Sequence, residues 1–427
     1  MNVLEINDTG LLLSDGARVI AESPGFAALE GKTLHVGATA RARSRLDPRR
    51  AFSRFWYQLD ATLPAPAGAA RTHADLAFTH LQSLRGLAGD APLILATPGS
   101  HTREQLAILL GLVEASGLRA EGLVDTAVAS CTQVETLETT LHLDVELHRF
   151  VLTVIHGGAE VSRVRVEEVS KPGLTVIWDA LARVAAQAFV QQTRFDPLHN
   201  ASTEQTMFDA LPGWLALLAG SPNAVLELVV GARTHRASVS RDDLVKRLVE
   251  PFEDVSGGID QHGRPRPASV LLSARAAAVP GLAEHIEHAT GIAPVRLDPL
   301  AAARGALAQA TRIAVPGAGL AYVTRLTGIA RRIDAGTEVG APTHVLVGDR
   351  ALPVPRRDGD PMLPLSHLRT GVPGALRQLD GRLWVDGAPT ETVLLNGKPA
   401  RLPLRVGLGD RVEIGGMLLR LIEVAGT

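Results

Sequence analysis

Two patterns of hydrophobic residues alternate along residues 1–310 of this 427-residue chain. Short apolar runs bounded by turn residues are typical of buried strands, and they occur at 93–97, 150–155, 225–230 and 269–273. Between these runs apolar residues recur every three or four positions, as in amphipathic helices, most clearly at 72–87 and 176–193. Strands that alternate with helices predict an α/β fold.

The pattern changes after about residue 335. Helical periodicity ends, proline and glycine become frequent, and short strands are predicted at 344–348, 382–385, 391–395, 403–406, 411–414 and 417–423. We therefore predict a separate all-β domain at 336–427, which is a usual length for a domain.

Composition excludes several classes of protein and of site. With 46% hydrophobic and 21% charged residues the chain is expected to be globular, and its net charge of −2 gives no general attraction to nucleic acid or anionic membranes. A single cysteine, Cys131, excludes an internal disulfide and a multi-cysteine metal site. No apolar run reaches the roughly 18 residues of a membrane span, and residues 1–30 lack the pattern of a signal peptide. We expect a cytoplasmic location and no membrane insertion.

One stretch carries a family resemblance. The predicted strand at 93–97 ends in Thr97-Pro98, a helix follows and ends at Ser116-Gly117-Leu118, and a second short strand leads into Asp125-Thr126-Ala127. This order resembles the centre of the DnaK-type heat-shock chaperone ATPases, members of the actin superfamily. Further stretches resemble the same family in collinear order, at 18–25, 36–40, 237–254, 271–282 and 298–306. The resemblance implies a two-lobed fold of ribonuclease H-like subdomains over 1–335, with approximate lobes at 1–140 and 141–335.

The resemblance also implies where a nucleotide would bind. The family holds ATP with glycine-rich turns and holds Mg²⁺ through acidic residues. On this basis His156, Gly157 and Gly158 belong to the second phosphate turn, Ser273 contacts the base side, and Asp125 is the remaining catalytic acid. The residues themselves leave two alternatives open: an ordinary hairpin turn at 156–159, and a helix N-cap at Asp125.

Several residues that the family uses for ATP hydrolysis are missing. The first phosphate turn lacks a Gly-Thr-Thr triplet. When the hairpin is kept aligned with the family, Val3 stands where the family has its metal-side aspartate; shifting the alignment brings in Glu5 or Asp8. Both acidic positions that flank the second turn are valine, and no lysine at 33–90 takes the catalytic lysine's place. Loss of the acidic metal shell weakens metal-assisted phosphoryl transfer. We expect little or no ATPase activity, no metal site and no required cofactor, with binding of ATP or ADP left open.

Turn and strand motifs of the C-terminal region carry a second resemblance. Val347-Gly348-Asp349-Arg350, Ser366-His367 and Asn396-Gly397 follow the order of a forkhead-associated domain, a β-sandwich that binds phosphothreonine peptides. The resemblance implies phosphopeptide contacts from Arg350, Ser366 and Asn396, and an arginine fork with hydroxyl donors suits a phosphate dianion. The alternative is a structural or protein-binding β-sandwich, because Asn-Gly alone suits a type I′ turn.

Three functions follow as expectations. The first is a non-catalytic scaffold or adaptor that binds other proteins within a larger bacterial assembly, on the basis of the missing catalytic positions. The second is an ATP-binding switch with weak ATPase activity. The third is a reader of phosphothreonine peptides through the C-terminal domain, which would make phosphorylated proteins its partners. Nucleic acid is not expected as a partner in any of them.

Overall fold

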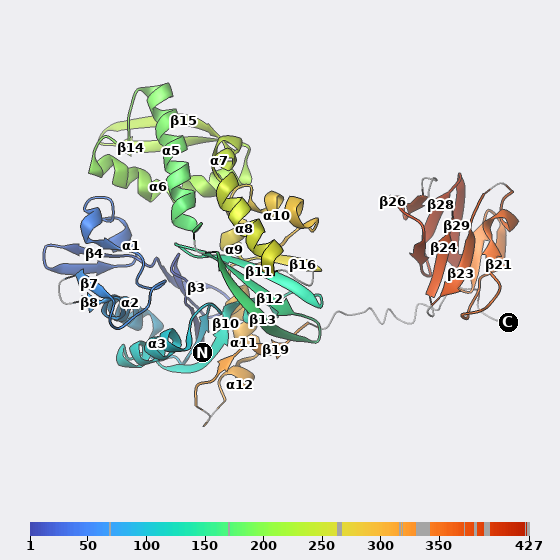
Figure 1. Ribbon diagram of the computed structural model, residues 1–427, viewed down its shortest axis with the longest axis horizontal. Coiled ribbons are helices and arrows are strands. Elements are labelled where there is room, and N and C mark those ends of the chain that lie inside the picture. Colours follow the sequence, from blue (N-terminus) through green and yellow to red (C-terminus); the bar gives the residue numbers. More distant parts are fainter. Residues whose placement is uncertain are drawn as a thin grey trace. The chain divides into compact units, whose positions relative to one another are not determined.

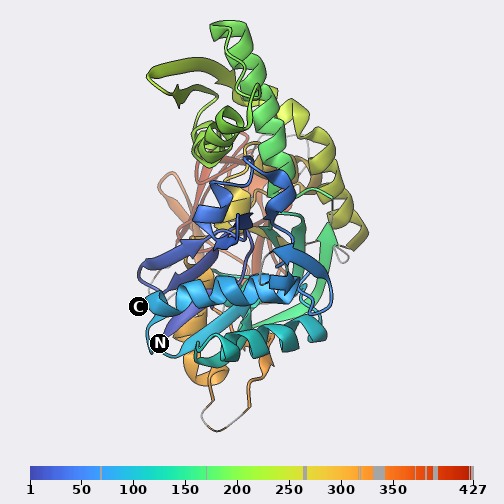
Figure 2. The same cartoon turned by 90° about the vertical axis from the view of Figure 1, so that its left-hand side faces the viewer.

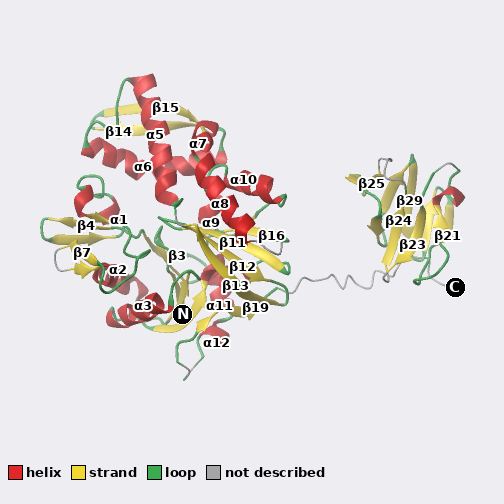
Figure 3. Ribbon diagram, viewed as in Figure 1, coloured by secondary structure: helices red, strands yellow, loops and turns green. Residues whose placement is uncertain are grey.

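The computed structural model describes residues 1–67, 70–169, 171–262, 267–315, 317, 319–329, 342–370, 372–379, 382–387, 393–422 and 424. The chain divides into unit 1 (Met1–Arg331) and unit 2 (Arg332–Thr427), and the predicted boundary after residue 335 lies outside the described residues (Figure 1). Unit 1 mixes helices with strands, which confirms the α/β prediction. The described part of unit 2 is built from strands with one short helical turn (Figure 3).

The first sheet of unit 1 has the strand order β3-β2-β1-β9-β10-β18. Its strands are β1 (Asn2–Glu5), β2 (Leu11–Ser14), β3 (Val19–Ser23), β9 (Leu93–Thr97), β10 (Ala120–Asp125) and β18 (Tyr322–Val323). β1 pairs antiparallel with β2 and parallel with β9, and β9 pairs parallel with β10. Because β18 lies far beyond residue 140, segments from both predicted lobe ranges build this sheet.

The second sheet has the order β17-β16-β11-β12-β13-β19. Its strands are β11 (Thr139–Val145), β12 (Phe150–His156), β13 (Glu160–Val169), β16 (Ser269–Leu272), β17 (Val295–Arg296) and β19 (Arg325–Thr327). β11 pairs antiparallel with β12 and parallel with β16, as β1 does with β2 and β9. The two sheets therefore repeat one plan, and β1 and β11 occupy equivalent central positions.

Helices cover the sheets, and several of them begin at side-chain caps. α2 (His73–Ala88) and α3 (Arg103–Ala115) lie side by side (Figure 2), and each begins with a capping box, at Thr72 and Thr102. α4 (Thr126–Cys131) packs against α11 (Ala301–Ala308) so closely that a Cβ built at Gly305 would overlap the carbonyl oxygen of Ala129. Only glycine fits at this crossing.

The remaining elements of unit 1 form two smaller groups and some connecting helices (Figure 1). One group contains α5 (Leu174–Thr193), α6 (Ala201–Gly220), β14 (Asn223–Val230), β15 (Arg233–Ser240), α7 (Arg241–Arg247) and α8 (Val249–His262). The other contains β4 (Ala27–Glu30), β5 (Thr33–Val36), α1 (Ala38–Arg41), β6 (Ala51–Phe52), β7 (Pro64–Ala67) and β8 (Ala70–Thr72). The connecting helices are α9 (Ala274–Ala277), α10 (Leu282–Thr290) and α12 (Ala310–Ile313). No helix in the described residues is long and apolar enough to cross a membrane.

Unit 2 consists of two antiparallel sheets that share one hydrophobic core. The six-stranded sheet has the order β21-β20-β29-β28-β25-β26 and contains β20 (His344–Val347), β21 (Arg350–Pro353), β25 (Val393–Leu395), β26 (Lys398–Ala400), β28 (Arg411–Ile414) and β29 (Met417–Ile422). The four-stranded sheet has the order β22-β23-β24-β27 and contains β22 (Leu363–Pro364), β23 (Ala375–Leu379), β24 (Arg382–Asp386) and β27 (Leu404–Val406). The core draws on both sheets, with Val345 and Leu419 from the first and Leu376 and Val385 from the second.

Candidate functional site

Each central strand of unit 1 ends in a buried carboxylate. Glu5 is the last residue of β1 and is 2% exposed, and Asp144 is the next-to-last residue of β11 and is 7% exposed. Both lie at the carboxyl edge of parallel strands, where α/β sheets usually bind their ligands. A buried carboxylate needs a charged or hydrogen-bonding partner, because burial without one strongly disfavours the ionised form.

Arg275 supplies that partner to both carboxylates. It is the second residue of α9, directly after β16, and its Nη2 forms ion pairs with Glu5 Oε1 and, at 3.1 Å, with Asp144 Oδ2. Ser273, the N-cap of α9, donates from Oγ to Asp144 Oδ1 at 2.5 Å. Burial acts to raise the pKa of Asp144, but Arg275, His142 and Ser273 outweigh it and the pKa is lowered. One guanidinium therefore joins the two sheets through their equivalent acids, an arrangement that we call the arginine bridge.

The turns that follow the two central strands are bonded directly to each other. Asn7 Nδ2 in the β1–β2 turn donates to Asp144 Oδ2 at 3.1 Å and to the carbonyl oxygen of Val145 at 3.2 Å. In return, the backbone amide of Leu147 in the β11–β12 turn donates to Asp8 Oδ1 at 2.6 Å. Polar groups of these turns thus bind one another across the two sheets.

Two further buried acids lie beside the arginine bridge. Asp8 Oδ2 and Glu146 Oε1 are buried and have no hydrogen-bond partner among the described residues. Burial raises the pKa of Asp8 well above its usual value, and the neighbouring Glu146 carboxylate raises it further. Burial also raises the pKa of Glu146, against the opposing effect of Arg149, whose Nε lies 2.6 Å from Glu146 Oε2. The pair Asp8 and Glu146 is therefore destabilised when both carboxylates are ionised.

Replacing Asp8 with asparagine should stabilise unit 1 at neutral and alkaline pH. The raised pKa means that the folded protein loses this proton at higher pH than the unfolded chain, so the parent's stability falls as pH rises above about 4. The asparagine side chain would keep the acceptor for the Leu147 amide and lose the charge, and we expect a gain of about 1–2 kcal/mol at pH 8 that vanishes near pH 4. Urea unfolding at several pH values measures this difference.

The exposed aspartate Asp254 on α8 provides the matched control, because Asp254→Asn removes a carboxylate that is not buried. Its effect should not depend on pH in the same way. If Asp8→Asn lowers stability at pH 8 as much as at pH 4, the repulsion between Asp8 and Glu146 has been assigned wrongly.

A central cavity of about 430 Å³ lies next to Arg275. Its walls are largely apolar, with Trp178 from α5 and Pro212 and Leu215 from α6, and Arg41 also lines it. The Arg41 guanidinium lies 5.0 Å from the centre of the Trp178 ring, and the buried Nε1 of Trp178 has no partner among the described residues. Within the described residues, no group of three or more His, Cys, Asp or Glu side chains is arranged to hold a metal ion.

No protein-family model matches the chain, and no curated protein matches its sequence. The geometry of these residues therefore carries the functional argument.

Asp125 serves as a helix cap and as a second link between the sheets. Its Oδ1 accepts hydrogen bonds from the backbone amides of Ala127 at 2.9 Å and Val128 at 3.1 Å, which confirms the N-cap alternative. Its Oδ2 pairs with Arg163 Nη1 of β13 at 2.8 Å and accepts from the Tyr322 hydroxyl at 3.2 Å. Both oxygens of Asp125 are occupied by the protein itself.

The predicted nucleotide-binding residues are not brought together. His156, Gly157 and Gly158 lie at the β12–β13 turn, where His156 is the partner of Thr139 at the start of β11. Ser273 follows β16, and its backbone amide donates to the carbonyl oxygen of Leu143, near the other end of β11. At about 3.4 Å per residue the two groups are on the order of 15 Å apart. The backbone amides of Gly157 and Gly158 are already bonded, to the carbonyl oxygen of Glu138 and to Thr136 Oγ1, so the structure shows the ordinary hairpin turn here.

The strand β11 was not predicted from the sequence, so the turn that follows it was not considered as a candidate site. Thr139–Val145 alternates polar and apolar residues, which is typical of a strand with one solvated face, yet His142 and Asp144 are both buried. The turn equivalent to β1–β2 is β11–β12, and its residues include Glu146 and Leu147 instead of glycines. In the first sheet β1 ends on Glu5, and Val3 belongs to the hydrophobic core.

The three predicted phosphopeptide residues of unit 2 are also separate. Arg350 begins β21 at one edge of the six-stranded sheet, and Asn396 follows β25, which lies four strands away. At about 4.8 Å per strand this is on the order of 19 Å. Ser366 lies in the turn at Leu365–His367 that joins the four-stranded sheet, and Asn396 uses its side chain to bond Asp410 and the amide of Arg411.

Proposed function

We propose that this protein is a non-catalytic scaffold or adaptor, built on a two-lobed fold of the actin and heat-shock-chaperone type whose catalytic centre has become an internal ionic contact. Support for this fold comes from the repeated strand order of the two sheets and from the close crossing of α4 and α11 between them. In unit 2, the two antiparallel sheets around one core support a β-sandwich that also binds proteins.

The observation that carries the proposal is the arginine bridge from Arg275 to Glu5 and Asp144. In phosphoryl transfer, carboxylates at such strand ends hold Mg²⁺, and backbone amides of the neighbouring turns approach the phosphates. Here one guanidinium pairs with both carboxylates, and the amide of Leu147 is already bonded to Asp8. A magnesium nucleotide would have to break these contacts and leave the charge of Arg275 without its partners.

A fixed relation between the two sheets suits a scaffold. The arginine bridge, the turn-to-turn hydrogen bonds of Asn7 and Asp8, and the Asp125–Arg163 pair all connect the first sheet to the second. A second connection lies above the central cavity, where Arg41 donates to the carbonyl oxygen of Phe208 at 2.8 Å. A protein held in this way presents one constant surface to its partners, independent of nucleotide.

A second candidate function, binding of ATP or ADP without hydrolysis, is favoured by one observation. The central cavity beside Trp178 offers apolar walls and two arginines, Arg41 and Arg275, together with one acid, Glu22. Reading of phosphothreonine is supported by no comparable observation, because Arg350 and Asn396 are four strands apart.

The proposal is tested by a phosphate-release assay on the purified chain with ATP, with and without Mg²⁺. We expect no release above that of buffer, and no increase in Glu5→Gln, because both acids of the parent are already paired with Arg275. Binding of any partner should likewise be unchanged by ATP, ADP or EDTA. Magnesium-dependent hydrolysis that is lost in Asp144→Asn would overturn the proposal.

A further inference from the structure

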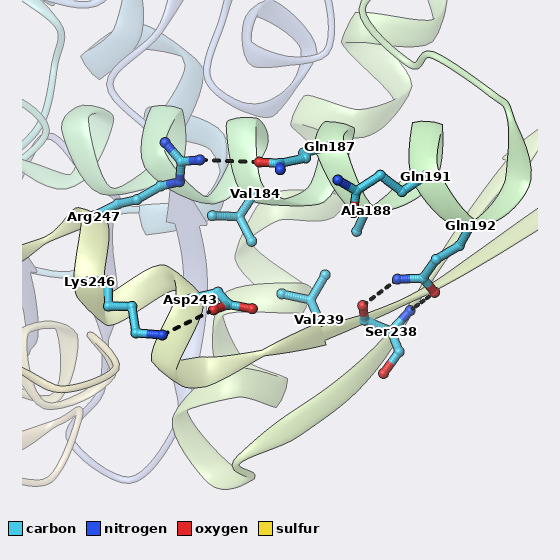
Figure 4. A pocket seen from close by; sticks show the side chains of 10 residues that line it. All are labelled: Val184, Gln187, Ala188, Gln191, Gln192, Ser238, Val239, Asp243, Lys246 and Arg247. Carbon is cyan, nitrogen blue, oxygen red and sulfur yellow. Dashed lines mark hydrogen bonds and ion pairs between the residues drawn. The ribbon is translucent and has the colours of Figure 1, made fainter.

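A groove far from the arginine bridge lies between α5 and α7 (Figure 4). It encloses about 430 Å³, and the buried side chains of Val184, Ala188 and Val239 contribute apolar surface to it. Polar pairs lie around it: Arg247 with Gln187 at 3.2 Å, and Lys246 with Asp243 at 3.5 Å. The lining is therefore mostly polar with a smaller apolar part, and a peptide can contact both, through its backbone and through its side chains.

At one end of the groove a glutamine side chain makes the backbone hydrogen bonds that a neighbouring strand would make. Gln192 Nε2 donates to the carbonyl oxygen of Ser238 at 2.9 Å, and the amide of Ser238 donates to Gln192 Oε1 at 2.8 Å (Figure 4). These are the two hydrogen bonds that a paired strand would make to Ser238. The exposed Gln192 side chain therefore occupies the position of a strand, and another chain could replace it without loss of hydrogen bonds.

The edge of β15 continues beyond this point without a partner. β14 and β15 form a two-stranded sheet, so the side of β15 that faces away from β14 is an edge. Backbone groups alternate in direction along a strand, so Thr234 and Arg236 point to the same side as Ser238. In the described residues no backbone or side-chain group bonds the main chain of Thr234 or Arg236 on this side. Open edges of this kind accept an added strand.

Charge at the groove favours an acidic occupant. Lys246 and Arg247 line it from α7, and Arg194 follows the end of α5 two residues after Gln192. Asp243 is the acidic residue of the lining and is already paired with Lys246. No carboxylate of the described residues lies within ion-pair distance of Arg247. Its guanidinium donates instead to the neutral side chain of Gln187. A carboxylate on the incoming chain would supply the missing partner.

We propose that this groove docks an extended acidic segment of a partner protein, which pairs with the outer edge of β15 in place of the Gln192 side chain. Its apolar residues lie over Val184 and Ala188, and its carboxylates lie beside Lys246 and Arg247. This proposal adds to the scaffold function the chemistry of one partner. It does not depend on Arg275 and would stand even if the central cavity bound a nucleotide.

A fluorescein-labelled peptide in which valine alternates with glutamate is the probe, and anisotropy with the full chain is the readout. We expect the peptide to bind the parent weakly and Gln192→Ala about 10-fold more tightly, because two competing hydrogen bonds are removed. Two peptide controls separate the contributions. The first is the same peptide N-methylated at alternate residues, which lacks the backbone donors of a strand. The second has lysine in place of glutamate, which reverses the charge. Each should bind Gln192→Ala at least about 10-fold more weakly than the unmodified glutamate peptide does.

On the protein side, the double variant Lys246→Ala/Arg247→Ala should lose most binding of the glutamate peptide. The exposed Lys171 lies outside the groove lining, and Lys171→Ala should change nothing. The proposal is overturned if neither the parent nor Gln192→Ala binds the peptide, or if the N-methylated or lysine peptide binds equally well. Self-association of Gln192→Ala in sedimentation velocity, without peptide binding, would also overturn it, because the occupant would then be a second copy of the chain.

Discussion

Arg275→Ala is expected to destabilise unit 1 by about 3–5 kcal/mol, the usual cost of removing one partner from a buried ion pair. The substitution leaves Glu5 and Asp144 buried without a cation, and it also removes the contact that joins the two sheets. Equilibrium urea denaturation, followed by the fluorescence of the buried Trp56 and Trp178, measures the change in the free energy of unfolding.

Two further variants make this result interpretable. Arg236→Ala removes an arginine from an exposed pair with Glu227, and such pairs contribute less than about 1 kcal/mol. The triple variant Arg275→Met/Glu5→Gln/Asp144→Asn removes all three charges together and should recover most of the loss, because no charge is left unpaired. The account of the arginine bridge fails if Arg275→Ala costs no more than Arg236→Ala.

Asp125→Ala is expected to cost about 3 kcal/mol, from a lost helix cap and a broken buried pair. Asp125 is fully buried, and its two oxygens serve different partners, the amides of α4 on one side and Arg163 on the other. Asp125→Asn keeps the cap, since asparagine caps helices as well as aspartate does, and loses only the charge. It should therefore cost about half as much by the same urea measurement.

The ratio between these two variants decides what Asp125 does. Equal losses in Asp125→Ala and Asp125→Asn would mean that the cap contributes nothing and that the Arg163 pair is the whole effect. A loss below about 1 kcal/mol in Asp125→Ala would contradict the structural role altogether, because buried charged partners cost more than that when removed.

Local signals in the sequence predicted local structure well. The apolar run that ends at Thr97 is the buried strand β9, and the helical pattern at 72–87 is α2. The predicted helix at 176–193 is α5, and the change of pattern after residue 335 falls close to the division between the units. In these segments the hydrophobic period is clear, so nearby residues contain the information.

The site was harder to predict because it depends on residues far apart in the chain. Arg275 and Glu5 are separated by 270 positions, and neither belongs to a motif that marks the other. The strand β11 was not predicted, and the glycine pair alone assigned the second turn to Gly157 and Gly158. In unit 2 the strands were largely predicted, but only the strand order shows that Arg350 and Asn396 are far apart.

The central claim is that the arginine bridge takes the place of a magnesium nucleotide, and calorimetric titration of Mg·ATP into the purified chain tests it most directly. The account predicts no saturable heat for the parent, because Glu5, Asp144 and the amide of Leu147 are already bonded within the protein. Saturable heat that requires Mg²⁺ and disappears in Asp144→Asn would contradict it.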